Sequence, residues 1–155
     1  MTSTPSPPET PFAERYGGRP FGDATVEDVM MNGVVTCRPQ TSLIDAARIM
    51  AGYGIHCLVL RYGAHDSASS RWGMLSDLDL VARAGSGDTA GQAARTDVVP
   101  VSSNMPLEEA ARRMVEYGVQ HLLVTEPHST HPIGVLSTLG IARAVAATRD
   151  QEENR

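Results

Sequence analysis

The sequence predicts a mixed α/β (α+β) protein made of two copies of a β-α-β-β-α unit, packed sheet to sheet and related by a pseudo-twofold axis. The first observation behind this prediction is an internal repeat, since the segment that begins at Leu43 recurs at Leu107, 64 positions later. The second is hydrophobic periodicity, because both segments place apolar residues at helical positions i, i+3, i+4 and i+7, between short β-branched runs. A unit of this size exposes too much of its sheet alone, so the two copies should cover each other.

Length and composition set the expected domain organisation. The chain has 155 residues, 41% of them apolar and 20% charged, which is enough for one compact domain or two small interlocked halves. We expect a flexible N-terminal tail over residues 1–22, rich in Pro, Ser and Thr, then a first repeat over 23–84 and a second over 85–147. Residues 148–155 are mostly charged and have no apolar face, so we expect a C-terminal tail that frays beyond Ala147.

Each copy is expected to open with a short helical turn and a strand. The turn is indicated by the spacing of a capping box, a Thr followed three residues later by an Asp or a Gln. These pairs are Thr25 with Asp28 and Thr89 with Gln92. The β-branched runs at 34–37 and 98–101 then predict the first strand of each copy.

The central helix is the most strongly indicated element of each copy. A Leu, two Ala and a Met form its apolar face, and a Gly stands where the C-cap needs a left-handed residue. These residues are Leu43, Ala46, Ala47, Met50 and Gly54 in the first copy, and Leu107, Ala110, Ala111, Met114 and Gly118 in the second.

Two further strands and a final helix complete each copy. The strands are expected over 56–61 and 72–75 in the first copy, and over 120–125 and 133–136 in the second. A polar loop over 63–70 joins the two strands of the first copy, and the final helices begin at Ser76 and Ser137. A linker rich in Gly and Ser, over 84–88, connects the copies.

These motifs resemble a known family. Each copy has the pattern L-x-x-A-A-R-x-M-x-x-x-G-[IV] on its central helix, the first copy has D-V-M before its Val-Val strand, and the segment 73–79 reads G-M-L-S-D-L-D. Over residues 25–145 the chain is similar to tandem cystathionine β-synthase (CBS) domains, the pair known as a Bateman module. The resemblance implies a stand-alone regulatory module that binds an adenosine derivative (AMP, ADP, ATP or S-adenosylmethionine) between the copies and forms a disc-shaped homodimer.

Composition argues against several other functions. The net charge of -5, without a basic tract, disfavours nucleic-acid binding, and the apolar runs are far shorter than the roughly 20 residues of a membrane span. The two cysteines are too few for a disulfide framework, and no segment has the form of a signal peptide, so we expect a reduced, cytoplasmic protein. The chain has no lysine and no Ser-His-acid or Cys-His order, so we expect no catalytic residue and no enzyme activity.

The segment 73–79 is the best candidate for a binding site. Gly73 can let a ligand approach the strand, and the Ser76 hydroxyl, beside free backbone N–H groups at a helix start, suits a phosphate. The Asp79 carboxylate can accept hydrogen bonds from the two ribose hydroxyls, and the resemblance implies the same roles. A structural interpretation stays open beside this one, because Ser76 and Asp79 also have the spacing of a capping box.

The resemblance assigns further residues to the same cleft. It places Gln120 and His121, at the start of a strand of the second copy, toward Asp79, where His121 could donate to a phosphate. A hydrogen-bonded structural histidine is the alternative. The adenine pocket would be lined from residues 34–37, including Thr36 and Cys37, and by Ile55 and Leu58.

The second copy departs from the family pattern. It keeps Gly134 and Ser137 but has Gly140 where the first copy has its carboxylate. Loss of an ionised acceptor would forfeit about 1.5–3 kcal/mol, so we predict one competent cleft per chain and a degenerate one, toward which His56 and Cys57 would lie.

Neither the histidines nor the cysteines indicate a metal site. His128 and His131 have no third ligand at a convincing spacing, and a turn between two prolines explains them better. Cys37 and Cys57 are expected on neighbouring strands as free thiols rather than as a redox pair.

Two functions therefore remain in view. The first is a sensor that needs no cofactor, binds an adenosyl ligand and modulates an effector protein that the sequence does not name. The second is a ligand-free module for homodimerisation or protein docking, which the missing acid at Gly140 favours. Both predict a homodimer through the helices, since exposure of Leu80, Val81, Ile141 and Val145 would otherwise add apolar surface.

Overall fold

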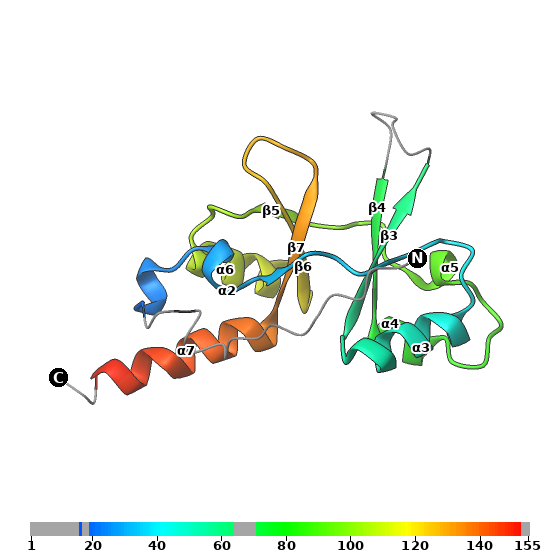
Figure 1. The fold of residues 1–155 in the computed structure, drawn as a ribbon, viewed down its shortest axis with the longest axis horizontal. Helices are drawn as coiled ribbons and strands as arrows, with labels where there is room; N and C mark the ends of the chain where they lie inside the picture. The colour runs from blue at the N-terminus through cyan, green and yellow to red at the C-terminus, as the bar shows by residue number, and fades with distance from the viewer. Residues whose placement is uncertain (1–15, 17–18, 64–70, 153–155) are drawn as a thin grey trace.

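The computed structural model describes residues 16, 19–63 and 71–152. Most of the expected N-terminal tail and of the polar loop over 63–70 lies outside these residues. The mixed α/β fold with two sheets and a repeated unit is confirmed (Figure 1). No helix in the described ranges is both long and apolar enough to cross a membrane.

The repeat appears as two sets of matching elements. The first set is β2 (Thr36–Cys37), α3 (Leu43–Tyr53), β3 (Cys57–Tyr62), β4 (Arg71–Ser76) and α4 (Asp77–Ala82). The second set is β5 (Pro100–Ser102), α6 (Leu107–Tyr117), β6 (His121–Thr125), β7 (Pro132–Ser137) and α7 (Thr138–Glu152). The remaining elements are η1 (Phe21–Asp23), α2 (Val26–Val29), β1 (Met31–Asn32) and α5 (Ala90–Ala93).

Local signals placed the helix ends correctly. Gly54 and Gly118 both adopt the left-handed conformation after α3 and α6, with φ of 62° and 63°. Thr89 and Gln92 form the expected capping box at α5, and the Asp28 carboxylate accepts from the backbone N–H of Thr25 at α2.

Each sheet combines parallel and antiparallel pairing. In the first sheet, in the order β2-β3-β4, β2 runs parallel to β3, and β3 runs antiparallel to β4. The second sheet repeats this arrangement with β5, β6 and β7 and adds β1 at its edge, antiparallel to β7.

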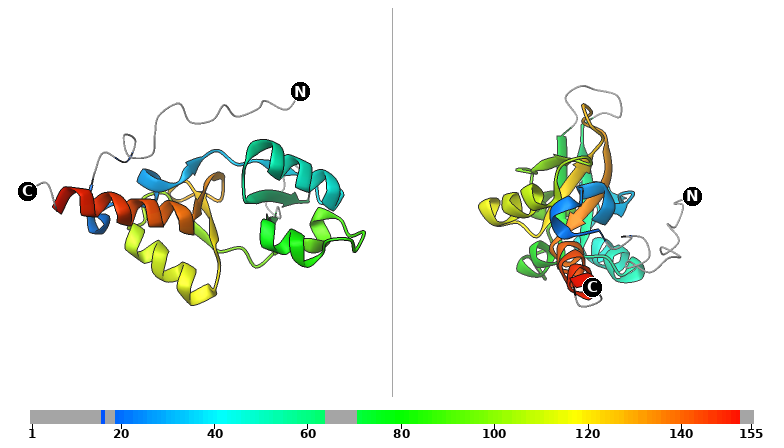
Figure 2. Two further views of the ribbon diagram at one scale, coloured as in Figure 1. Left: turned by 90° about the horizontal axis from the view of Figure 1, so that it is seen from below. Right: turned by 90° about the vertical axis from the view of Figure 1, so that its left-hand side faces the viewer.

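The two sheets pack face to face, with helices on their outer sides. Figures 1 and 2 show α3, α4 and α5 at one end of the molecule and α2, α6 and α7 at the other, with the sheets between them. Side chains from both sheets form a shared core at the centre: Cys57, Val59, Met74 and Leu123, with Val34, Trp72, Val98 and Val135 against them. The predicted packing of sheet on sheet is therefore correct.

The opening segments of the two repeats are exchanged. Helix α2 buries Val26 and Val29 in the core formed by α6 and the second sheet, and β1 extends that sheet. In the same way, Ala90 of α5 is buried in the core of the first sheet, and Arg95 pairs with Met74 of β4 through two backbone hydrogen bonds of 2.9 Å. The packing units therefore differ from the continuous segments 23–84 and 85–147.

Glycines permit these crossed segments to lie close to the sheets. A Cβ at Gly134 would collide with the backbone carbonyl of Met31, and a Cβ at Gly73 would lie 2.7 Å from the ring of Tyr62 and 3.2 Å from the carbonyl of Arg95. The space beside Gly73, which the sequence suggested for a ligand, is occupied by the protein itself.

Both chain ends are more structured than expected. Tyr16, inside the expected tail, is buried in the core of the second sheet at 2% exposure, and η1 follows it. Helix α7 continues beyond Ala147 to Glu152, so residues 148–152 extend a helix and do not begin a frayed tail.

Candidate functional site

A cavity of about 180 Å³ lies between the two repeats. The first repeat contributes the end of β4 and the start of α4, and the second contributes the segment before β5 and the turn between α6 and β6. Its lining is Cys57, Met74, Ser76, Leu78 and Asp79 from the first repeat, and Arg95, Asp97, Val98, Val99, Gly118, Val119, Gln120 and His121 from the second.

Ser76 and Asp79 are held in place by a capping box at the start of α4. The Asp79 Oδ2 atom accepts from the Ser76 backbone N–H at 3.1 Å and from the Ser76 hydroxyl at 2.8 Å, and the Ser76 Oγ accepts from the Asp79 backbone N–H at 3.1 Å. The structural interpretation of this pair is therefore correct. Both side chains also line the cavity, so the cap fixes the position of the Asp79 carboxylate on its wall.

His121 lines the same cavity from the opposite repeat. It lies at the start of β6, where its partner in the register is Ser137. Burial lowers the pKa of His121 below its ordinary value, while Asp77 and Asp79 act in the opposite direction. The ring is therefore neutral at pH 7 and can offer one N–H donor to a ligand.

Cys57 lines the cavity from the first sheet as a buried thiol. Burial, with a smaller contribution from Asp79 and Asp77, raises the pKa of Cys57 to about 12. Cys37, on neighbouring β2, is also a free thiol, and burial raises its pKa as well.

The nine residues expected at the ligand are not all brought together. Ser76, Asp79, Gln120 and His121 line the cavity. Gly73, Thr36, Cys37, Ile55 and Leu58 do not: Leu58 is fully buried under α3, Cys37 and Ile55 pack against that core, and Thr36 is exposed on β2.

The apolar lining of the cavity comes in large part from the second repeat, whereas the sequence predicted it from the first. Val98 and Val99 are the repeat equivalents of Val34 and Val35, and Val119 is the equivalent of Ile55. The exchange of segments therefore places these residues of the second repeat, and not the expected ones of the first, beside Asp79. The repeat alignment contained this signal. Arg95 and Asp97 were not anticipated, because no motif marks them.

Gly140, the equivalent of Asp79 in the second repeat, is packed against helix α2. A Cβ at Gly140 would lie 3.3 Å from Cγ1 of Val29 and 3.6 Å from Oγ of Ser137. Gly140 donates its backbone N–H to that Ser137 hydroxyl, so the helix cap survives without the carboxylate. Helix α2 therefore lies where a side chain at position 140 would project.

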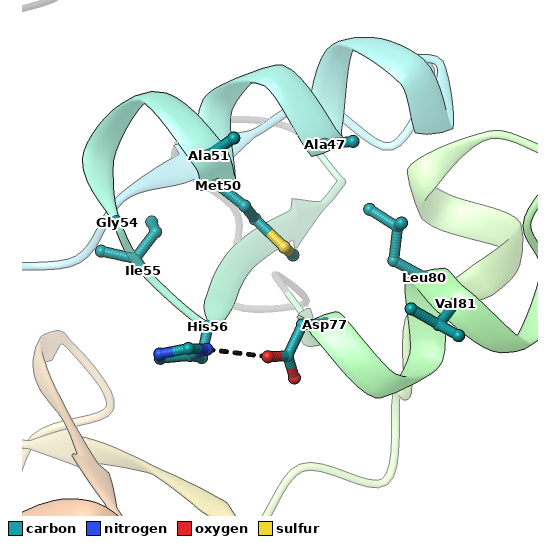
Figure 3. Close-up of a pocket in the computed structure, with 9 residues that line it drawn as sticks. All are labelled: Ala47, Met50, Ala51, Gly54, Ile55, His56, Asp77, Leu80 and Val81. Atoms are coloured by element: carbon teal, nitrogen blue, oxygen red, sulfur yellow. Dashed lines mark hydrogen bonds and ion pairs between the residues drawn. The ribbon is translucent and has the colours of Figure 1, made fainter.

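A second, more open groove of about 460 Å³ lies between α3 and α4 (Figure 3). Ala47, Met50, Leu80 and Val81 give it an apolar lining, and the His56 to Asp77 contact closes one end. The His56 Nδ1 and Asp77 Oδ2 atoms are 2.7 Å apart, and this contact lowers the pKa of Asp77.

Several apolar side chains on α3 and α4 are exposed. Ile44, Leu78 and Val81 are 66%, 63% and 66% exposed, and of these Val81 lines the groove, whereas Leu78 lines the cavity between the repeats. On the helices of the second repeat, Val115 and Val145 are exposed in the same way, whereas Leu80 and Ile141, also expected at a dimer contact, pack partly against the cores.

The described residues contain no group of three or more His, Cys, Asp and Glu side chains that could hold a metal ion. His128, which has φ of 60°, and His131 lie in the turn that joins β6 to β7.

Comparison with protein families gives a clear match. The family model described as the CBS domain matches residues 26–85 and again residues 90–147. A search of curated protein sequences found no match.

Solved structures share the fold. The CBS domain pair of protein MJ0100, in complex with 5′-methylthioadenosine and S-adenosyl-L-methionine, has a TM-score of 0.69 and 18% identity, covering 79% of this chain and 96% of that one. CBSX2 in complex with AMP has a TM-score of 0.63 and 24% identity, covering 84% and 98%. Hypoxic Response Protein I, with two coordinated zinc ions, has a TM-score of 0.59 and 29% identity, covering 77% and 98%.

Proposed function

The chain belongs to the CBS domain family, as a tandem pair, and on this premise we propose that it is a sensor that binds an adenosine derivative between its repeats and modulates a partner protein. It acts by binding and not by catalysis. The candidate ligands are AMP, ADP, ATP and S-adenosylmethionine, together with related 5′-substituted adenosines.

The observation that carries the proposal is the composition of the cavity between the repeats. Its apolar wall of Val98, Val99 and Val119 suits a purine base, and the preset Asp79 carboxylate suits the two ribose hydroxyls. Two proteins of the same fold hold such ligands, MJ0100 with 5′-methylthioadenosine and S-adenosyl-L-methionine, and CBSX2 with AMP.

A ligand in this position can transmit a signal because both repeats contribute to its surroundings. Filling the cavity favours the relative arrangement of the sheets in which Ser76 and Val119 both reach the ligand. The shift in population is limited by the difference in affinity between the two arrangements.

The test is thermal unfolding with each ligand, using two variants that both break a capping box. Asp79→Ala removes the side chain that completes the capping box of α4, and Gln92→Ala does the same at α5. Of the two residues, only Asp79 lines the cavity. Without ligand, both variants should lose about 1 kcal/mol, or roughly 2–4 °C in Tm.

With ligand at a hundredfold excess over Kd, the wild type and Gln92→Ala should gain about 2.7 kcal/mol, or roughly 5–10 °C. Asp79→Ala should show little or none of this gain. A wild type that no adenosyl ligand stabilises would sink the sensor function and leave Ser76 and Asp79 as a helix cap.

A second role, homodimerisation through the helices, is favoured by the exposed apolar surface beside the groove between α3 and α4. Val81→Asp should shift the sedimentation coefficient toward that of a monomer. The control change Asn32→Asp, which adds the same charge on exposed β1, should leave it unchanged. A wild type that sediments as a monomer at high concentration would contradict this role.

A further inference from the structure

The cavity between the repeats has more acidic than basic side chains on its walls. Asp79 and Asp97 contribute carboxylates, while Arg95 is the one Arg or Lys among the lining residues. The Arg95 and Asp97 side chains are exposed and make no ion pair with each other within the described residues.

The other polar groups do not reverse this balance. His121 is neutral at pH 7 because burial lowers its pKa, so it offers a donor without a charge. Asp77 lies close enough to act electrostatically on both His121 and Cys57, as Asp79 does, which adds a third carboxylate to the local field. Lysine is absent from the whole chain.

The size of the cavity also disfavours a ligand with a long phosphate chain. At about 180 Å³ it is below the roughly 300 Å³ at which drug-sized ligand pockets begin. A nucleoside alone would fill a cavity of this size, so a triphosphate chain would have to extend along walls that carry two carboxylates and one guanidinium.

We propose that this cavity selects adenosyl ligands with little or no negative charge, such as a 5′-thioether or sulfonium nucleoside, over adenine nucleotides, and that Asp97 sets this discrimination. The inference rests on the proposed adenosyl site and adds its selectivity. A 5′-phosphate brings about two negative charges at neutral pH, and each further phosphate adds to the repulsion. Asp97 is suited to this role because it lines the cavity and its side chain takes part in no ion pair among the described residues.

The test is calorimetric titration of the full chain with 5′-methylthioadenosine, AMP and ATP, at low ionic strength and without magnesium, so that charge is least screened. We expect 5′-methylthioadenosine to bind at least about tenfold more tightly than ATP, a difference of about 1.4 kcal/mol, with AMP between them.

Three variants separate charge from shape. Asp97→Asn should raise the affinity for AMP by about tenfold relative to that for 5′-methylthioadenosine. Arg95→Gln should lower the same ratio by a similar factor, and it leaves intact the backbone pairing with Met74. The matched control Asp23→Asn, on η1 and outside the cavity lining, should leave the ratio unchanged.

The outcomes distinguish the two proposals. If neither these three ligands nor S-adenosylmethionine, titrated in parallel, binds, the adenosyl site itself is wrong and its selectivity falls with it. If the ligands bind but ATP binds as tightly as 5′-methylthioadenosine, or Asp97→Asn leaves the ratio unchanged, the site stands and the charge selection is overturned.

Discussion

A methyl group added at Gly134 should separate β1 from the second sheet. The new Cβ would overlap the backbone carbonyl oxygen of Met31 and lie 3.1 Å from Sδ of Met30. Because the main obstacle is backbone, it cannot rotate away as a side chain can. The two register pairs of β1, Met31 with Val135 and Asn32 with Gly134, would have to break or shift.

The magnitude follows from the contacts that are lost. Overpacking costs about 1–3 kcal/mol, and about two weakened backbone hydrogen bonds cost about 1 kcal/mol each. Replacing a strand Gly by Ala returns about 0.5–1 kcal/mol. Gly134→Ala should therefore lose about 3 kcal/mol, which lowers Tm by roughly 6–12 °C.

Two further glycines provide internal comparisons. At Gly73 the nearest obstacle is the ring of Tyr62, a side chain that can move at the expense of its 3.0 Å hydrogen bond to the Gly91 carbonyl, so Gly73→Ala should lose only about 1–2 kcal/mol. At Gly52, within α3, a Cβ meets nothing within 4 Å, so Gly52→Ala should gain about 0.5–1 kcal/mol.

Urea unfolding of the three variants and the wild type, followed by circular dichroism, measures this order. If Gly134→Ala is as stable as the wild type, or more stable than Gly73→Ala, then β1 is not fixed against β7 and the exchange of segments would be refuted.

Three further predictions concern titration and reactivity. Stability should fall as pH drops below about 6.5, because burial lowers the pKa of His121 and the unfolded chain then binds the proton first; urea unfolding of His121→Gln should lack this slope. The contact with His56 lowers the pKa of Asp77 below its ordinary value of about 3.8, so above that pH this contact slightly stabilises the folded protein, and it ceases to do so on further acidification. The difference in Tm between Asp77→Asn and the wild type should therefore vanish at low pH, and it should shrink with added salt. Cys57, whose pKa is about 12, should react with iodoacetamide at pH 8 far more slowly than half-buried Cys37, as mass spectrometry of timed samples would show, and equal rates would contradict its burial.

Features set by neighbouring residues were predictable from the sequence. The capping boxes at Thr89 and Ser76, the C-cap at Gly54 and the central helices all depend on contacts within a few positions, and the structure has each of them. The repeat then predicted the paired sheets, because two similar apolar sheet faces can cover each other.

The exchange of segments was not predictable in this way. Strand β1 has only two residues, Met31 and Asn32, and both are exposed, so no alternation of apolar and polar side chains marks the sheet that it joins. Its partner is decided by the close approach at Gly134, a contact between residues far apart in the chain.

Contacts between residues far apart in the chain also limited the prediction of the candidate site. The motif located Ser76 and Asp79, and the family resemblance brought in Gln120 and His121. The apolar wall was expected on the wrong copy, because residues that follow an exchanged segment face the other repeat. Asp97 was missed since a single acid in a linker has no local signature.

The exchange also decides when the chain can finish folding as it leaves the ribosome. The first unit lacks α5 and the pairing of Arg95 until the synthesis of the second repeat has begun. Helix α2 and β1 are synthesised before the sheet that they join, and β1 has no partner strand until β7 has emerged. The burial of Val26 and Val29 in that core therefore has to wait until the second repeat has been synthesised.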